Sequence, residues 1–447
     1  MCSCVRVDPE VGRKKGEKDE DRHKRRDRQP KHSSRNLLRL RPTPRQLNHE
    51  GAACVATYSC ANNERAADDG EPPDEQRMVP RSLTTGNLEV SADPASSRPF
   101  GHAWSVATYV LHMDLDQFIA AVEMLRRPEI RDKPVVVGGD GDPTKRGVVS
   151  TANYEARRFG IRSAMPLRTA FKRAPEAVFL PVDADAYLEA SRRVMDTLRT
   201  FPAVVEVAGW DEAFMEVETE DPEGLAREVQ KAVLDRTELW CSIGVGDNKL
   251  RAKIASGFAK PAGVFRLTRE NWFEVMGPLP TSELWGIGKK TAPKLEALGI
   301  RTVEQLANSD EEMLAARFGP STGPWLRRLG TGEDQSTVTA ESYVPRGRGR
   351  ERTFQEDITD PDEVRREVAA LARQLALDLE DSGRLVERVV VKVRFKPFFT
   401  STHGVPLPEP SLEPVAVEAG ALAALAKFDL DRPVRLLGVR AELVRPN

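Results

Sequence analysis

The 447-residue chain has no long hydrophobic run, few cysteines and almost no net charge. No stretch approaches the ~18 apolar residues of a membrane-spanning helix, so the sequence predicts no membrane span. Of five cysteines, only Cys241 lies beyond residue 60, and a large core without paired cysteines indicates a reducing, cytoplasmic location. The net charge of −2 excludes a uniformly basic protein but is compatible with local basic surfaces.

Residues 1–104 differ in composition and in hydrophobic pattern from the rest of the chain. Mixed-charge and acidic polar stretches alternate there without any apolar periodicity, so we expect a disordered N-terminal extension. A basic arm for nucleic acid and a wrongly chosen translation start are the alternatives. The apolar segment of a secretory signal is absent from these residues.

The remaining sequence divides by pattern into three parts and a linker. Short β-branched runs and amphipathic stretches interleave over residues 105–275, which predicts an α/β or α+β domain. Residues 276–340 are helical in pattern, and residues 341–351 are rich in Arg, Gly and Pro, which is typical of a linker. Strand and helix patterns alternate again over residues 352–447. The length also favours about three domains.

Three acidic residues stand in strand-like apolar surroundings: Asp114 after "YVLHM", and Asp211 and Glu212 inside "VAGWDEAFMEV". A carboxylate at the end of a buried strand costs several kcal/mol unless a cation or hydrogen bonds compensate for it. Two such strands side by side would bring the acids together, and divalent cations would relieve their repulsion. Adjacent side chains of a regular strand point oppositely, so Asp211 and Glu212 share a site only if the chain turns there, as Gly209 permits. Caps and exposed turn acids are the alternative, and Asp116 is predicted to be the N-cap of the next helix.

Five blocks occur in a fixed order: "HMDLDQFIAAVE", "STANYEARRFGIRSAMP", "WDEAF", "CSIGVGDNKLRAKIASGFAKPAG" and "LWGIGKKTAPKLEALGI". Together they resemble the Y-family DNA polymerases, in their DinB or DNA polymerase IV branch, over residues 106–447. The resemblance implies an α+β multidomain, right-hand polymerase with a ferredoxin-like palm, small fingers, a helix-hairpin-helix thumb and a βαβ-type little finger. Palm and fingers would occupy residues 105–275, with the fingers at about 125–182. The thumb would take residues 276–340 and the little finger residues 352–447.

The resemblance also implies roles for the acidic residues. Asp114 and Asp211 would bind both of two Mg²⁺ ions, for which Mn²⁺ can substitute. Glu212, the catalytic position, would bind the catalytic ion, and the carbonyl of Leu115 the ion that accompanies the nucleotide. Gly209 and Trp210 stand where the family usually has serine and an aliphatic residue, so local packing differs while the ligands are kept.

A second block supplies a predicted triphosphate site. Thr151, Tyr154 and Arg157 offer a hydroxyl, a phenol and a guanidinium near the start of a helix, where main-chain amides also favour phosphate. Tyr154 and Arg157 are three residues apart and therefore reach the same side of that helix. Alone, "YEARR" is more typical of a solvated helix face. Lys260 matches the family lysine that contacts nucleotide phosphates.

Phe118 and Ile119 are the positions predicted to discriminate between substrates. Ile119 corresponds to the steric gate of the family, which is normally Phe or Tyr and lies against the sugar. Isoleucine is smaller and not flat, so we expect weaker exclusion of a 2′-hydroxyl and insertion of ribonucleotides. The alternative is that Ile119 is simply a core residue of the helix.

The predicted DNA contacts lie in the C-terminal half of the chain. Gly286 and Gly288 allow close approach of a backbone phosphate in a helix-hairpin-helix, and Lys289 and Lys290 start its second helix. Arg348 and Arg350, in "PRGRGRER", would add phosphate contacts. The aromatic pair Phe398 and Phe399 is predicted either to touch DNA or to pack beneath a hairpin.

These features predict a monomeric, template-directed polymerase of the translesion or repair type. It would add dNTPs, and to some extent rNTPs, to the primer of a primed DNA template. We expect low fidelity and no proofreading, because no exonuclease-like acid set is present. The ending "AELVRPN" lacks a Gln-x-x-Leu-Phe-like peptide, which argues against docking on a sliding clamp. A non-catalytic DNA-binding relative or adaptor is the alternative, although such a protein has no need of Asp114, Asp211 and Glu212.

Overall fold

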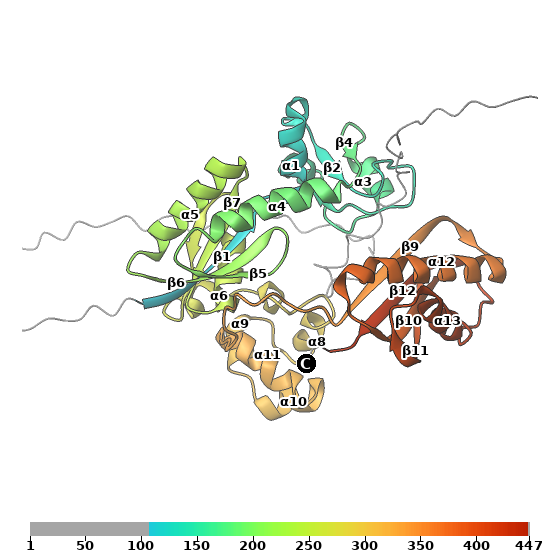
Figure 1. The fold of residues 1–447 in the computed structure, drawn as a ribbon. Coiled ribbons are helices and arrows are strands. Elements are labelled where there is room, and N and C mark those ends of the chain that lie inside the picture. The colour runs from blue at the N-terminus through green and yellow to red at the C-terminus, as the bar shows by residue number, and fades with distance from the viewer. Residues whose placement is uncertain (1–106, 446–447) are drawn as a thin grey trace, which may run out of the picture. The chain divides into compact units, whose positions relative to one another are not determined.

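The computed structural model describes residues 107–445. The prediction for residues 1–104 therefore lies outside the described part of the chain. No helix between residues 107 and 445 combines the length and the apolar character that crossing a membrane requires. The described elements form three sheets and a set of short helices (Figure 1), which together make an α+β fold as predicted.

The part predicted to be the palm is built on a five-stranded sheet in the order β5-β6-β1-β7-β8. Strand β1 pairs antiparallel with both β6 and β7, while β7 and β8 are parallel. The strands are β1 (Ala107–Leu115), β5 (Val204–Val207), β6 (Glu212–Thr219), β7 (Cys241–Gly246) and β8 (Val264–Arg266). The helices of this part are α1 (Phe118–Arg126), α4 (Ala184–Leu198), α5 (Pro222–Thr237) and α6 (Lys249–Ala259).

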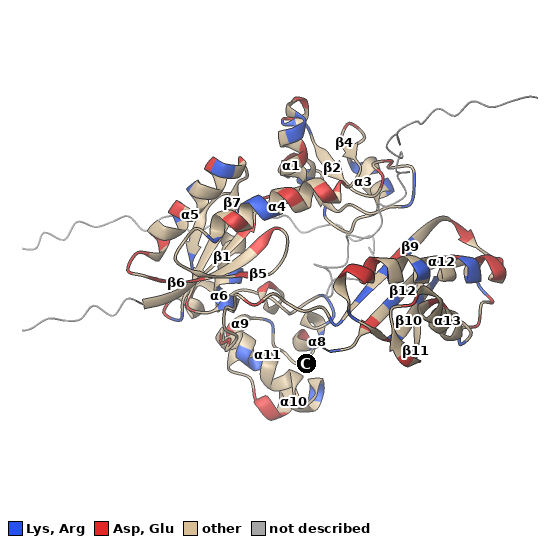
Figure 2. Cartoon of the chain, viewed as in Figure 1, with Lys and Arg blue, Asp and Glu red and all other residues tan. Residues whose placement is uncertain are grey.

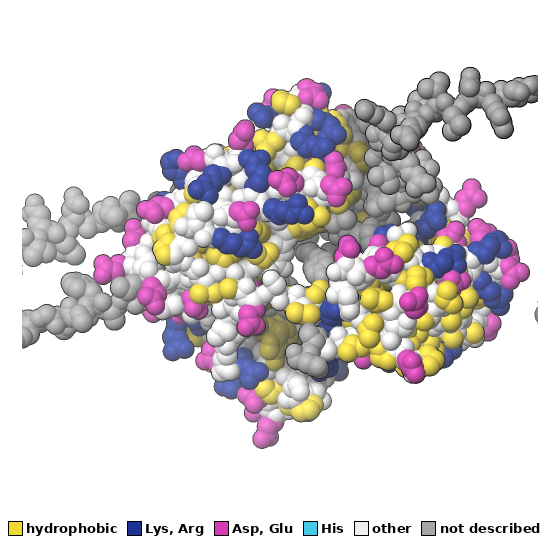
Figure 3. All heavy atoms as spheres, viewed as in Figure 1, with side chains coloured by type: hydrophobic (Ala, Val, Ile, Leu, Met, Phe, Trp, Pro, Cys, Tyr) yellow, Lys and Arg dark blue, Asp and Glu magenta, His cyan; other side chains and the backbone are white. Residues whose placement is uncertain are grey.

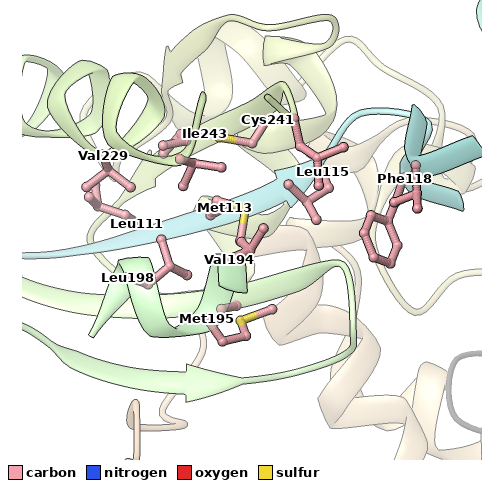
Figure 4. Packing of buried hydrophobic residues seen from close by; sticks show 14 of the residues in the cluster. Leu111, Met113, Leu115, Phe118, Val194, Met195, Leu198, Val229, Cys241 and Ile243 are labelled. Carbon is pink, nitrogen blue, oxygen red and sulfur yellow. The ribbon is translucent and has the colours of Figure 1, made fainter. Parts of the chain in front are cut away.

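Alternation along β1 assigns its side chains to two faces of the sheet. Leu111, Met113 and Leu115 pack with residues of α4 and α5, including Val194 and Val229, in one buried cluster (Figure 4). The alternate residues of β1, which include His112 and Asp114, turn to the opposite face, where Ser256 and Lys260 contact them. The apolar run therefore has a core face and a face that supplies the functional acids.

The fingers contain a small sheet in the order β3-β2-β4, in which β2 pairs antiparallel with β3 and parallel with β4. Their elements are a 3-10 turn (Pro128–Ile130), β2 (Val135–Val137), β3 (Thr151–Ala152), α2 (Tyr154–Arg157), α3 (Leu167–Arg173) and β4 (Val178–Leu180). The valines of β2 are fully buried, as their β-branched run predicted.

The region predicted to be the thumb is helical, but its helices begin at Trp272 and end at Thr331 rather than filling residues 276–340. Its elements are α7 (Trp272–Met276), a 3-10 turn (Thr281–Glu283), α8 (Ala292–Glu296), α9 (Val303–Ala307), α10 (Glu311–Phe318) and α11 (Thr322–Thr331). Trp272 is buried, and its indole nitrogen donates a hydrogen bond to the carbonyl of Gly330 at 2.8 Å.

The last part carries an antiparallel four-stranded sheet in the order β11-β10-β12-β9. Its elements are β9 (Gly347–Ile358), α12 (Pro361–Leu379), a 3-10 turn (Glu380–Ser382), β10 (Val386–Phe395), β11 (Phe399–Ser411), α13 (Pro414–Leu425) and β12 (Val434–Leu443). Residues 347–351 belong to β9 rather than to a linker, because they pair with β12 through residues 438–442. Basic and acidic residues are interspersed along α12 and α4 (Figure 2), as expected of helices with faces exposed to water.

Candidate active site

The three predicted acids meet where β1 ends and β6 begins. Asp114 and Glu212 are paired across the two strands, and Asp211 lies directly before β6. Its carbonyl accepts a hydrogen bond from the amide of Leu115 at 2.9 Å. The amides of Ala208 and Gly209 both donate to the carbonyl of Glu212 at 3.1 Å, which closes a tight turn between β5 and β6. The chain therefore turns at Asp211, as the sequence required for both acids to face one site.

Gly209 leaves room for the two acids at this turn. A Cβ at this position would lie 3.3 Å from Cγ of Glu212 and 3.4 Å from an oxygen of Asp211. A larger residue would therefore crowd Glu212 slightly and lie in van der Waals contact with Asp211.

Asp211 is an acid without sufficient compensation. Burial, followed by the nearby charges of Asp114 and Glu212, raises its pKa to about 6. A carboxylate beside two further carboxylates is stabilised in its charged form by cations or hydrogen bonds, and here a main-chain hydrogen bond and the charge of Lys260 offset the rise in pKa only in part. The electrostatics of this site thus favour positively charged ligands. We call Asp114, Asp211 and Glu212 the carboxylate site.

The other two acids are each paired with a lysine. Lys253 lies in α6, and Lys260 is the C-cap of that helix. Lys260 Nζ lies 2.5 Å from Asp114 Oδ1, and Lys253 is hydrogen-bonded to Glu212. Burial acts to raise the pKa of Glu212, but His112 and Lys253 together lower it to about 2. As these side chains stand, residues 107–445 contain no cluster of three Asp, Glu, His or Cys side chains grouped closely enough to hold an ion. Divalent cations would have to replace the lysine ammonium groups on the two carboxylates.

His112 lies buried beneath the carboxylate site and was not among the predicted residues. Its Nδ1 is 2.8 Å from Ser256 Oγ, and its Nε2 is 3.5 Å from Glu212 and 3.3 Å from Lys253. Burial is the main cause that lowers its pKa, so the ring is neutral near pH 7. These contacts join residues more than a hundred positions apart, so no local sequence pattern could have linked them.

Asp116 is not the N-cap of α1, contrary to the sequence prediction. Gln117 occupies that position, and no side chain caps the helix. Asp116 is buried instead, with 4% of its surface exposed. Its carboxylate accepts hydrogen bonds from Tyr154 Oη at 2.9 Å, Ser242 Oγ at 3.0 Å and the amide of Ala262 at 2.8 Å. It therefore ties β1, β7 and the segment after α6 together.

Asp116→Ala should lower the free energy of unfolding by about 3 kcal/mol, because it leaves buried donors without an acceptor. Chemical denaturation of the full chain measures this loss. Asp132→Ala, at an exposed acid of the fingers, is the matched control and should change stability by less than about 0.5 kcal/mol. Equal stability of the two variants would show that Asp116 is not a structural acceptor.

The predicted triphosphate residues lie together on β3 and α2. Arg157 lies over the ring of Tyr154 at 5.2 Å, and its Nε donates to the carbonyl of Ala152 at 2.9 Å. Thr151 opens β3 and pairs with β2. Burial and the charge of Asp116 raise the pKa of the Tyr154 phenol, so it remains a hydrogen-bond donor near neutral pH.

The helix amides predicted to bind phosphate are already used. Helix α2 has a single turn, and the side chain of Asn153 accepts from the amide of Ala156 at 3.0 Å. The amide of Tyr154 donates to the side chain of Gln117 at 2.7 Å. The side chains of Tyr154 and Arg157 also have protein partners, in Asp116 and the carbonyl of Ala152, so a phosphate contact by this helix stays a prediction.

Phe118 and Ile119 open α1 directly after the carboxylate site. They are 3% and 7% exposed, respectively, and both belong to the palm core cluster. The ring of Phe118 packs edge-on against Trp210, with 6.5 Å between ring centroids. Ile119 therefore contributes to the core, and its role toward a sugar stays a prediction.

Comparison with known proteins agrees with this arrangement. Residues 113–257 match the impB/mucB/samB family, residues 345–447 match its C-terminal domain, and residues 269–300 match the IMS family HHH motif. "DNA polymerase IV 2" of Mycobacterium tuberculosis is 49% identical over 339 residues, which cover 75% of this chain and 98% of the relative. The chain belongs to the Y family of DNA polymerases. It is a DNA-directed DNA polymerase of the translesion type.

More distant relatives and solved structures support the same assignment. "DNA polymerase IV" of Methanoculleus marisnigri is 36% identical over 340 residues, which cover 75% of this chain and 94% of the relative. The Y-family DNA polymerase chimera Dbh-Dpo4(243-245)-Dbh superposes with a TM-score of 0.68 at 25% identity, over 76% of this chain and all of that chain. DinB from Sulfolobus solfataricus gives a TM-score of 0.52 at 26% identity, with the same coverage.

In this polymerase the helix-hairpin-helix residues lie at the surface of the thumb. Gly286, Gly288, Lys289 and Lys290 are exposed in the turn before α8, and Gly286 has a φ of 102° that only glycine adopts easily. The lysines precede α8 rather than starting it, because the helix begins at Ala292. Their exposure is compatible with the predicted phosphate contacts.

The two arginines predicted to contact DNA before the little finger have protein partners. Arg350 forms a bidentate pair with Asp378 of α12, with 2.7 Å between Arg350 Nη2 and Asp378 Oδ1. Arg348 donates to the carbonyl of Asp378 at 3.1 Å. Both guanidinium groups thus fasten β9 to α12, and a DNA contact by either stays a prediction.

Proposed function

We propose that this polymerase joins nucleotides to a primer 3′ end by two-metal-ion chemistry at the carboxylate site. The observation that supports this most strongly is the proximity of Asp114, Asp211 and Glu212 at one edge of the palm, where the charge of Asp211 is only partly compensated. Oxygen donors of this kind suit Mg²⁺ and Mn²⁺. The carbonyl of Leu115, next to Asp114, is a further oxygen for the ion that accompanies the triphosphate.

Two bound cations would lower the pKa of the primer hydroxyl and neutralise charge on the reacting phosphate. The lysines have a second role in this scheme. Lys260, released from Asp114 when an ion binds there, can turn its ammonium to the triphosphate, beside Tyr154 and Arg157. Lys253 and His112 hold Glu212 in its ionised form, which is the form a metal ligand needs. Positioning and charge thus supply most of the catalysis.

We further propose that the pocket admits ribonucleotides, because Ile119 replaces an aromatic ring at the sugar position. A site can reject an unwanted substrate by a steric clash, and a smaller side chain gives a weaker clash with a 2′-hydroxyl. Synthesis would be of low fidelity and without proofreading. We propose that the chain works as a monomer in the cytoplasm.

The sheet of the little finger offers a face for the DNA duplex. Alternation along β10 turns Val391 and Val393 toward the core with α12 and α13, and Lys392 and Arg394 toward the opposite face. Arg440 of β12 stands on this same face. A Cβ at Gly347 would lie 3.2 Å from its Nε, so the glycine lets the guanidinium lie flat on β9. Lys392 is paired with Glu351 at 3.0 Å, so Arg440 is the cation of this face that we propose for a backbone phosphate.

Arg440→Ala should weaken duplex binding and reduce the slope of log K against log salt by about 0.9, the value for one phosphate contact. Fluorescence anisotropy with a blunt duplex at several salt concentrations measures both. An unchanged slope would show that Arg440 does not contact a phosphate, and would contradict the proposal that this face binds the duplex.

The proposed chemistry is tested by primer extension with Mg²⁺ and each of the four dNTPs and four rNTPs. We expect template-directed addition of all four dNTPs, measurable addition of rNTPs, and no addition after chelation with EDTA. Extension that persists in EDTA would exclude the two-metal proposal.

A further inference from the structure

The tip of the β10–β11 hairpin exposes two neighbouring phenyl rings. Phe398 is 61% exposed and Phe399 is 55% exposed. Lys396, beside them, has 67% of its side chain in solvent. Large apolar side chains that are adjacent and exposed commonly mark a binding surface. The alternative from the sequence, that these rings pack beneath the hairpin, is wrong.

Arginine side chains support both rings from the protein side. The guanidinium of Arg435 lies 4.7 Å from the ring centroid of Phe398. That of Arg432 lies 4.7 Å from Phe399 and 4.6 Å from the buried Phe395. Phe399 also stacks on Phe395, with 6.3 Å between centroids and 29° between planes. The rings are thus held by cation–π and aromatic contacts while more than half of each stays in water.

The charge around the tip is mainly positive. Arg394 and Lys396 lie within four positions of Phe398 in the chain, Arg435 lies at the start of the adjacent β12, and Arg432 lies two residues before that strand. Two acids offset part of this charge. Asp431 lies 3.3 Å from Arg432, and Asp357 lies 3.9 Å from Lys396.

We infer that Phe398 and Phe399 form a platform on which unpaired bases of single-stranded DNA stack, with Arg432, Arg435 and Lys396 near the phosphates. Exposed rings combined with cations match the two chemical parts of a single strand, base faces and phosphates. In a duplex the base faces are covered by their neighbours, so the rings could not stack on them. The inference rests on the proposed DNA-binding function and specifies one partner for a surface outside the carboxylate site.

The test compares two oligonucleotides that carry equal charge but differ in base faces. A 20-mer of deoxythymidine and a 20-mer of abasic residues are titrated with the full chain, without nucleotide, and followed by fluorescence anisotropy. The wild-type protein should bind the thymidine strand roughly tenfold more tightly than the abasic strand. The double variant Phe398→Ala, Phe399→Ala should bind both strands equally, at about the abasic level. Phe399→Tyr should keep the preference, because it keeps the ring.

Val415→Ala, at a residue of α13 that is 77% exposed, is the control and should leave both affinities unchanged. Phe398→Ala alone gives the same test if the double variant fails to fold, and should reduce the preference in part. Equal binding of the two strands by the wild-type protein would overturn the inference. An unchanged preference of the double variant for the thymidine strand would also overturn it. The exposed rings would then be a candidate surface for a protein partner. Because no nucleotide is present, failed primer extension with an intact base preference would refute only the proposed catalysis.

Discussion

Asp211→Asn should abolish primer extension and at the same time raise the melting temperature. The loss of one ligand from a two-ion site should lower kcat/KM by about 10³-fold. Stability should rise because the folded protein holds Asp211 with a pKa of about 6, above the value of an unfolded aspartate. A carboxylate with a raised pKa destabilises the fold at pH values above its unfolded pKa. We expect an increase of about 2–4 °C at pH 7 without divalent ions.

Differential scanning calorimetry and single-nucleotide extension measure the two effects on the same preparation. Glu212→Gln should lose as much activity without a gain in stability, because Lys253 already compensates Glu212. Mg²⁺ should raise the melting temperature of the wild-type protein and not that of Asp211→Asn. A variant that kept its activity would remove Asp211 from the metal site, whatever its stability.

Ile119→Phe should restore selection against ribonucleotides. The added ring should lower kcat/KM for rNTPs by about 100-fold and change that for dNTPs by only a few-fold. Because Ile119 is only 7% exposed within the palm core, the larger side chain should also reduce stability, by about 1–3 kcal/mol. Single-turnover insertion of matched dNTP and rNTP pairs measures the change in selectivity directly.

Ile119→Val is the control for core packing alone. It should cost about 1 kcal/mol of stability and leave sugar selection as relaxed as in the wild-type protein. Ile119→Phe could lose stability as expected and still leave the ratio of dNTP to rNTP efficiencies unchanged. In that case Ile119 would be a core residue and not a gate.

Local pattern was enough to predict the elements that carry the carboxylate site. The apolar run of β1 reaches Asp114, and Gly209 indicated the turn that precedes Glu212. Both features lie within a few residues of the acids, where turn chemistry and strand alternation apply. The ordered blocks then predicted the family that the comparisons show.

Local pattern missed or misassigned the roles of some residues, because tertiary contacts determine those roles. Asp116 precedes a helix and so resembles a cap, but its partner Ser242 is 126 positions away. His112 looked like part of an apolar strand, and only the fold brings Ser256 to it. Residues 347–351 have the composition of a linker, yet pairing with β12 makes them a strand. The sequence carries no local signal for such long-range partners.

Figure 3 shows acidic and basic side chains mixed over the visible surface, so overall charge gives little guidance to where ions or DNA bind.

The most direct test of the two-metal proposal is a count of the bound ions. Electron paramagnetic resonance can count the Mn²⁺ ions that the full chain binds with primed DNA and a non-hydrolysable dNTP. The account predicts two ions for the wild-type protein and at most one for Asp114→Asn or Asp211→Asn. Two ions retained in both variants would show that the carboxylate site does not hold the metal.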